Sequence, residues 1–94
     1  GNTAVGYRAG RSLTSSTGTT LFGYQAGGAA TMTGNGNTAI GYDAGKAMTS
    51  AASNVIIGQE AGDALTTGAS NVIIGQAALG AADGAELMGL IFAV

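Results

Sequence analysis

The fold is decided by the stretch "NTAIGYDAG" at residues 37–45, because close versions of it recur along the chain. Residues 2–10 read "NTAVGYRAG" and residues 54–62 read "NVIIGQEAG". The glycine after each apolar triplet serves as an anchor, and successive anchors lie 17, 18, 17 and 17 residues apart: Gly6, Gly23, Gly41, Gly58 and Gly75. Repetition at a short fixed period is typical of a solenoid. The pattern therefore predicts a five-copy repeat array over residues 1–80.

The one longer step falls between the second and third anchors. The segment "TMTGNGN" at residues 31–37 carries one residue more than the corresponding "TSSTGT" at residues 14–19. Thr, Gly and Asn are turn residues, and extra length costs little in a turn. We therefore predict that the second copy carries its insertion between Thr31 and Asn37.

The three positions before each anchor predict a short strand. They are β-branched or apolar without alternation, which is typical of a parallel strand buried on both faces. The position next to the anchor defines what we call the apolar column, and we expect it to lie in the core or in an interface between chains: Val5, Phe22, Ile40, Ile57 and Ile74.

After each anchor, small residues recur at spacings of three and four, which would place them on one face of a helix. Ala occupies the third position in every copy, and Gly occupies the fourth position in the first four copies. Each such Gly weakens a helix by about 1 kcal/mol relative to Ala. Two alternatives stay open, a helical turn or a tight bend that carries the same small residues inward. The fold class is a mainly β repeat solenoid, a parallel β-solenoid or β-roll with about 17 residues per coil.

A polar column lies four positions before the anchors, and Thr19 replaces the asparagine in its second copy: Asn2, Asn37, Asn54 and Asn71. Stacked amides can bond to one another along a solenoid, as in the asparagine ladders of stacked strands. The alternative is a turn residue whose side chain bonds locally to its own backbone. The sequence gives no preference between the two.

Composition predicts an association between chains. The chain has 94 residues with 18 Gly and 5% aromatic residues, so one stack has little material for a core. Three chains packed side by side would cover the second face of every strand. We therefore expect a homotrimer.

Residues 81–94 depart from the repeat and have no upstream counterpart. An atypical terminal unit often caps a solenoid, so the alternatives are a cap, an apolar plug at the oligomer axis, or a lead into a further domain. The apolar run at residues 87–94 is far shorter than the roughly 20 residues that span a bilayer. No membrane span is predicted.

The same composition argues against chemistry. A net charge of −2 with 9% charged residues is too weak and too negative for a nucleic-acid partner. Without His or Cys, the chain lacks the most common general base, metal ligands and thiol nucleophile. Asp43 and Glu60 share one column, but Arg8, Gln25 and Ala77 fill it in other copies, as in a column that faces water. We predict no enzyme, no catalytic or cofactor-binding residue, no metal site and no cofactor.

Tyrosine follows three successive anchors and forms what we call the tyrosine column: Tyr7, Tyr24 and Tyr42. If these rings are exposed, they could bind sugars or a partner. The other interpretation is that each ring packs on the edge of its coil with the hydroxyl in water.

The copies "GNTAVGYRAG", "GNTAIGYDAG" and "SNVIIGQEAG" resemble the N-T-A-I-G-Y-x-A repeats of phage tail fibres, over about residues 1–80. The resemblance implies a homotrimeric shaft on a virion, joined to further fibre or tip domains and supporting attachment to a host surface receptor. The I-G-x-x-A core is also similar to the head repeats of trimeric autotransporter adhesins, which implies a cell-surface or extracellular location. Those repeats are commonly shorter and carry a second A-x-G strand that is missing here.

Function is therefore expected to be structural, as a segment of a trimeric fibre shaft. The adhesin head or stalk is one alternative, and a filament that assembles end to end through exposed strand edges is another. A further alternative is a regular threonine array of the kind that ice-binding solenoids present. It would use two columns, the first of which continues as Val55 and Val72: Thr3, Thr20 and Thr38, and Thr14, Thr31, Thr49 and Thr66.

Overall fold

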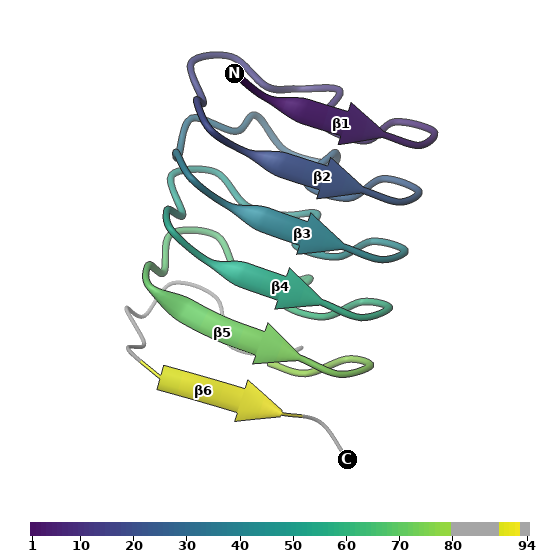
Figure 1. The fold of residues 1–94 in the computed structure, drawn as a ribbon, viewed down its shortest axis with the longest axis vertical. Helices are drawn as coiled ribbons and strands as arrows, with labels where there is room; N and C mark the ends of the chain where they lie inside the picture. Colours follow the sequence, from purple (N-terminus) through teal and green to yellow (C-terminus); the bar gives the residue numbers. More distant parts are fainter. Residues whose placement is uncertain (80–88, 93–94) are drawn as a thin grey trace.

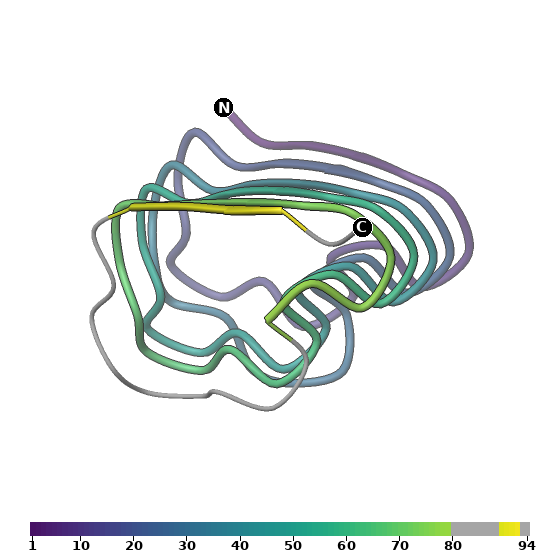
Figure 2. The ribbon, with the colours of Figure 1, turned by 90° about the horizontal axis from the view of Figure 1, so that it is seen from below.

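A computed structural model of the chain describes residues 1–79 and 89–92. Six short parallel strands form one sheet in the order of the sequence, and Figure 1 shows them stacked as successive rungs. The strands are β1 (Thr3–Val5), β2 (Thr20–Phe22), β3 (Thr38–Ile40), β4 (Val55–Ile57), β5 (Asn71–Ile74) and β6 (Gly89–Phe92). Seen along the stack, the chain winds in superimposed coils (Figure 2). The predicted parallel β-solenoid with about 17 residues per coil is confirmed.

The strand register matches the alignment of the repeats. Thr3 pairs with Thr20, which pairs with Thr38, and the column continues through Val55 and Val72. The same register extends into the C-terminal tail, where β6 pairs with β5 along all four of its residues. Although the sequence of the tail departs from the repeat, residues 89–92 therefore continue the sheet. The predicted role of the tail as a cap or plug also rests on residues 80–88 and 93–94, which lie outside the described residues.

In β2, β3 and β4 only the middle side chain is buried, and in β5 the alternate residues Asn71 and Ile73 are buried. Successive side chains of a strand point to opposite faces, so a three-residue strand places one side chain inside the coil and two outside. The inward positions of β2 to β5 are fully buried: Leu21, Ala39, Ile56 and Ile73. Within one chain, the other face of these strands is exposed or half-buried, so the prediction that neighbouring chains cover it stays a prediction.

The segment after each anchor is a bend, and the described residues contain no helix. The second residue after each anchor has a positive φ between 56° and 61°: Arg8, Gln25, Asp43, Glu60 and Ala77. The fourth residue has a positive φ as well, between 55° and 60°, in all five copies. Two left-handed residues so close together are incompatible with a right-handed helical turn. Of the two open alternatives, the bend is correct.

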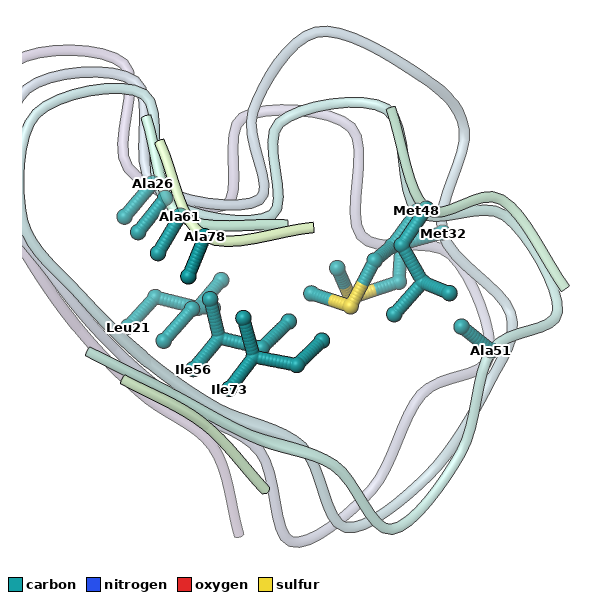
Figure 3. Close-up of a cluster of buried hydrophobic side chains, with 12 residues drawn as sticks. Leu21, Ala26, Met32, Met48, Ala51, Ile56, Ala61, Ile73 and Ala78 are labelled. Atoms are coloured by element: carbon teal, nitrogen blue, oxygen red, sulfur yellow. The ribbon is translucent and has the colours of Figure 1, made fainter. Parts of the chain in front are cut away.

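The bend carries its alanines into a narrow core. Ala26, Ala61 and Ala78 face Leu21, Ile56 and Ile73 across the inside of the coil (Figure 3). Met32, Met48 and Leu65 fill the other end of the same interior, and all three are at most 1% exposed. Because alanine is small, the two walls of the coil approach closely, and a few larger side chains suffice to fill the space between them.

The insertion in the second coil is not where the sequence placed it. Leu13 forms a bridge with Met32, and Met32 follows Gly27 by five residues, whereas Leu13 follows Gly10 by three. Compared with the first coil, the segment from Gly27 to Met32 is therefore two residues longer. The segment from Met32 to Asn37 is one residue shorter than its counterparts in the other coils. The prediction of a single insertion after Thr31 is wrong. Met32 has the volume to fill the interior position. A Cβ added to Gly27 would lie 2.8 Å from the end of the Met32 side chain and 2.9 Å from the end of the Leu21 side chain.

Candidate functional site

The anchor glycines hold successive coils at backbone contact. Their φ values lie between 123° and 137°, a region that is open essentially to glycine alone. A Cβ on Gly41 would lie 2.6 Å from the carbonyl oxygen of Gly58, and Gly6, Gly23 and Gly58 would meet their own successors at 2.7 to 2.8 Å. These contacts keep the residues on both sides of each anchor in register, so every column of the repeat becomes a straight row along the solenoid.

The buried polar row is what we call the asparagine column: Asn37, Asn54 and Asn71. Its members are at most 1% exposed. The Nδ2 group of Asn54 donates to Asn37 Oδ1 at 3.1 Å, and that of Asn71 donates to Asn54 Oδ1 at 3.1 Å. The same oxygens accept the backbone N–H of the next asparagine, at 3.1 and 3.0 Å. The ladder alternative thus describes these three residues, and every bond runs from one coil back to the preceding one.

The side-chain amides of Asn37 and Asn54 also bind the loops that close their coils. Asn37 Nδ2 donates to the carbonyl oxygen of Ala51 at 2.6 Å, and Asn54 Nδ2 donates to that of Gly68 at 2.9 Å. Asn2 makes the equivalent bond to Ser16 at 2.8 Å and accepts the N–H of Thr19 at 2.9 Å. It has no side-chain amide to bond to in the next coil, because Thr19 occupies that position. The column therefore joins strand to loop within a coil and coil to coil along the stack.

The outer face of the sheet exposes the apolar column. Val5 is 47% exposed, Phe22 54%, Ile40 38% and Ile57 36%. Ile74 on β5 is half-buried. An uninterrupted apolar row of this kind is unusual on the surface of a protein that stays monomeric. The structure places the column outside the coil, so of the two expected positions the core of the single chain is excluded and an interface stays a prediction.

The tyrosine column is exposed and stacked. The rings of Tyr7 and Tyr24 lie 5.4 Å apart at 18°, and those of Tyr24 and Tyr42 lie 5.0 Å apart at 8°. The three residues are 40% to 62% exposed. The guanidinium carbon of Arg8 lies 5.2 Å from the centre of the Tyr7 ring. Because the inner ring faces cover one another, the edges and hydroxyls face water, which is a poor platform for stacking a sugar.

The threonine columns differ from one another. Thr3 and Thr20 are exposed, and Thr38 is half-buried on the same outer face. In the second column, Thr33 stands beside Thr14 where the sequence alignment had placed Thr31, because the bridge partner of Leu13 is Met32. Hydroxyls of this column donate to carbonyl oxygens of the next coil, at 3.1 to 3.5 Å: Thr14, Thr33 and Thr49. This second row is bonded within the solenoid and offers no free hydroxyl array.

Among the described residues, one acidic side chain forms an ion pair. Lys46 Nζ lies 3.2 Å from Asp43 Oδ2. This hydrogen bond raises the pKa of Lys46 above its ordinary value; burial opposes the shift, and the charges of Asp43, Asp63 and Glu60 add to it. Sequence reasoning named the acidic column but missed its cation, although the spacing of three residues was visible. The structure does not describe Asp83, Glu86 or any partner that they have.

No pocket is found in the described residues, and residues 1–79 and 89–92 hold no group of three or more acidic, His or Cys residues that could bind a metal ion. Nor does this part of the chain include a helix long and apolar enough to cross a membrane. The candidate functional site is therefore the outer surface, where the apolar and tyrosine columns run side by side.

Comparisons of the chain with protein-family models, with curated proteins and with solved structures find no match.

Proposed function

We propose that this chain is a structural segment of a homotrimeric fibre, a shaft like those of phage tail fibres that supports attachment to a host. The observation that carries the proposal is the exposed apolar column on the outer face of the sheet: Val5, Phe22, Ile40 and Ile57 are each at least 36% exposed. The repeats that resemble fibre repeats are the same repeats that build this column. The number of copies, the virion location and the adjoining tip domains follow from the resemblance.

The energetics favour association through this face. Burying a large aliphatic or aromatic side chain completely gains about 1.5 to 3 kcal/mol, so covering side chains that are already about half-buried gains roughly 1 kcal/mol each. The gain repeats in every coil, because the column is straight and the strands are in register. A rigid row of small gains suits a shaft, whose contacts must be equivalent along its length.

The test is the native mass of the chain, measured by light scattering after size exclusion across a tenfold dilution. We expect a mass near three chains that persists on dilution. Ile57→Lys places a charge in the column and should give monomers. Ser50→Lys adds the same charge at an exposed residue outside the strands and should leave the mass unchanged. Circular dichroism checks that both variants keep the strand signal.

A folded wild-type monomer would contradict the proposal, as would association that Ile57→Lys leaves intact. The same sample distinguishes the threonine alternative, which the in-register row of exposed Thr3, exposed Thr20 and half-buried Thr38 favours. An ice-binding surface would give thermal hysteresis that Thr20→Lys abolishes. We expect none, because Phe22 projects beside that row at 54% exposure and Val replaces Thr in the later coils.

A further inference from the structure

The tyrosine column holds three phenol rings face to face at a water-exposed edge. Backbone hydrogen bonds hold each of these tyrosine residues to the coil that follows it. Gln25 N–H donates to the carbonyl oxygen of Tyr7 at 2.8 Å, and Asp43 N–H donates to that of Tyr24 at 2.9 Å. With 40% to 62% of each residue exposed, the rings are both accessible to a reagent and held beside a partner ring.

This arrangement matches the requirements of one chemical step. A phenol that loses one electron and one proton becomes a phenoxyl radical, and two such radicals join through the ring carbons beside the hydroxyls. Coupling is fast only when the rings are already neighbours, since holding two reacting groups together removes most of the entropy cost. We propose that the tyrosine column is a site of oxidative cross-linking, in which Tyr24 couples to Tyr42 in the next coil under a haem-peroxidase-type oxidant with hydrogen peroxide.

The balance of the step is complete. Two tyrosines and one hydrogen peroxide give one dityrosine and two waters. Each phenol supplies one electron and one proton, and the peroxide accepts both pairs. The new carbon–carbon bond forms between the two ortho positions, and the hydrogen on each of these carbons moves to the oxygen so that both rings become aromatic again. The chain therefore loses two hydrogen atoms.

Tyr24 is the partner common to both pairs, because it lies between the other two rings. Its pair with Tyr42 is closer and more nearly parallel, at 5.0 Å and 8°, than its pair with Tyr7, at 5.4 Å and 18°. Arg8 also lies over the Tyr7 ring. The Tyr24–Tyr42 link should therefore be the main product and the Tyr7–Tyr24 link the minor one. The proposal concerns neighbouring coils of one chain and does not depend on the number of chains in the proposed fibre.

The experiment treats the folded chain at high dilution with a haem peroxidase and limiting hydrogen peroxide, followed by denaturation, trypsin digestion and mass spectrometry. Trypsin cuts after Arg8, Arg11 and Lys46, so Tyr24 and Tyr42 stay together in peptide 12–46 and Tyr7 leaves in peptide 1–8. A Tyr24–Tyr42 link appears as peptide 12–46 lacking two hydrogens. A Tyr7–Tyr24 link joins peptides 1–8 and 12–46.

Tyr24→Phe keeps two tyrosines but places them two coils apart, so intramolecular dityrosine should fall at least tenfold. Tyr7→Phe is the matched control, since it also leaves two tyrosines but keeps the closer pair, and it should retain most of the product. The wild-type chain unfolded in urea should also lose most of it. The proposal is overturned if Tyr24→Phe yields as much intramolecular dityrosine as Tyr7→Phe, if unfolding makes no difference, or if the products link separate chains only.

Discussion

The asparagine column and the tyrosine column run along the same solenoid, at positions five residues apart in the repeat, as in Asn37 and Tyr42. Both arise from repetition at one period, but they stabilise the stack by different means. The asparagines are at most 1% exposed and use directional hydrogen bonds, whereas the tyrosines are at least 40% exposed and use ring contacts. A buried polar group is costly when unpaired, while an exposed ring loses little if its neighbour is removed. Repetition therefore aligns the residues, and burial decides how much each column contributes.

The largest effect should come from the anchor glycine that separates the two columns. Gly41→Ala places a Cβ 2.6 Å from the carbonyl oxygen of Gly58 at a φ of 132°. Because backbone meets backbone there, no side-chain movement relieves the clash, and we expect a loss of more than about 3 kcal/mol in unfolding free energy or no folding. Urea titration followed by circular dichroism measures it.

The control for that variant is Gly18→Ala. Gly18 also has a positive φ, of 63°, but nothing lies within 4 Å of its Cβ position. It should lose only about 1 to 2 kcal/mol, the cost of the left-handed conformation alone. Equal losses in the two variants would show that the conformation of the anchor matters and its close contact does not.

The next largest effect should come from the middle of the asparagine column. Asn54→Ala removes the acceptor of the Asn71 Nδ2 and backbone N–H groups and the side-chain donor to the Gly68 carbonyl, whereas Asn37 Oδ1 keeps the backbone N–H of residue 54. At about 1 to 3 kcal/mol for each buried unsatisfied group, we expect a loss of roughly 3 kcal/mol or more in unfolding free energy. Asn35→Ala is the matched control, since exposed Asn35 makes one bond, to the N–H of Thr17 at 2.9 Å, and should lose less than about 1 kcal/mol. A small loss for Asn54→Ala would contradict the contrast between the columns.

A smaller effect is expected in the middle of the tyrosine column. Tyr24→Ala removes both ring contacts, and such contacts are worth about 0.5 to 1.5 kcal/mol each when well packed. Because these rings are partly exposed, we expect a loss of about 1 kcal/mol in unfolding free energy by the same urea titration. Tyr24→Phe keeps the stack and should stay within about 0.5 kcal/mol of the wild type. A loss for Tyr24→Ala as large as that for Asn54→Ala would break the comparison.

The smallest effect concerns pH. Asp43 holds the pKa of Lys46 above its ordinary value of 10.5. A raised pKa in the folded state gives stability that is present below the unfolded value and is lost as pH rises through the folded value. The pair is partly exposed, so we expect less than about 0.5 kcal/mol, lost only above about pH 10.5. Lys46→Met keeps all three tyrosines, so its Tm difference from the wild type at pH 8 and at pH 11 isolates this pair. A difference that does not shrink at pH 11 would contradict the assignment.

Much of the architecture followed from spacing alone. The five anchors, the strand positions and the parallel stack were all visible in the sequence, because a solenoid converts a sequence period directly into contacts. The sequence did not show whether one or both faces of each strand are covered, because three consecutive apolar residues give the same pattern in either case. That question depends on other chains, which a single repeat does not encode.

Two local features could not be predicted from the sequence, for different physical reasons. The spacing of the small residues after each anchor fitted a helix or a bend equally. Only the left-handed conformation of non-glycine residues such as Gln25 distinguishes the two. In the second copy, "TMT" offered two threonines for one position. Residue identity could not distinguish Thr31 from Thr33, whereas in the structure Met32 fills the interior of the coil and pairs with Leu13, which places Thr33 in the column. The exposed state of the tyrosine column was among the open alternatives, but its ring spacing could not be read from one copy.

The register of the coils also determines how the solenoid responds to force. Each coil contacts only its neighbours, and the strands are held by rows of backbone bonds between adjacent rungs. Tension applied along the stack would load these rows one after another, so coils would peel from an end in sequence. Each would release about 17 residues and lengthen the chain by roughly 50 Å, from the contour length of an extended residue and the rung spacing. Under load, the protein would extend in a series of nearly equal steps.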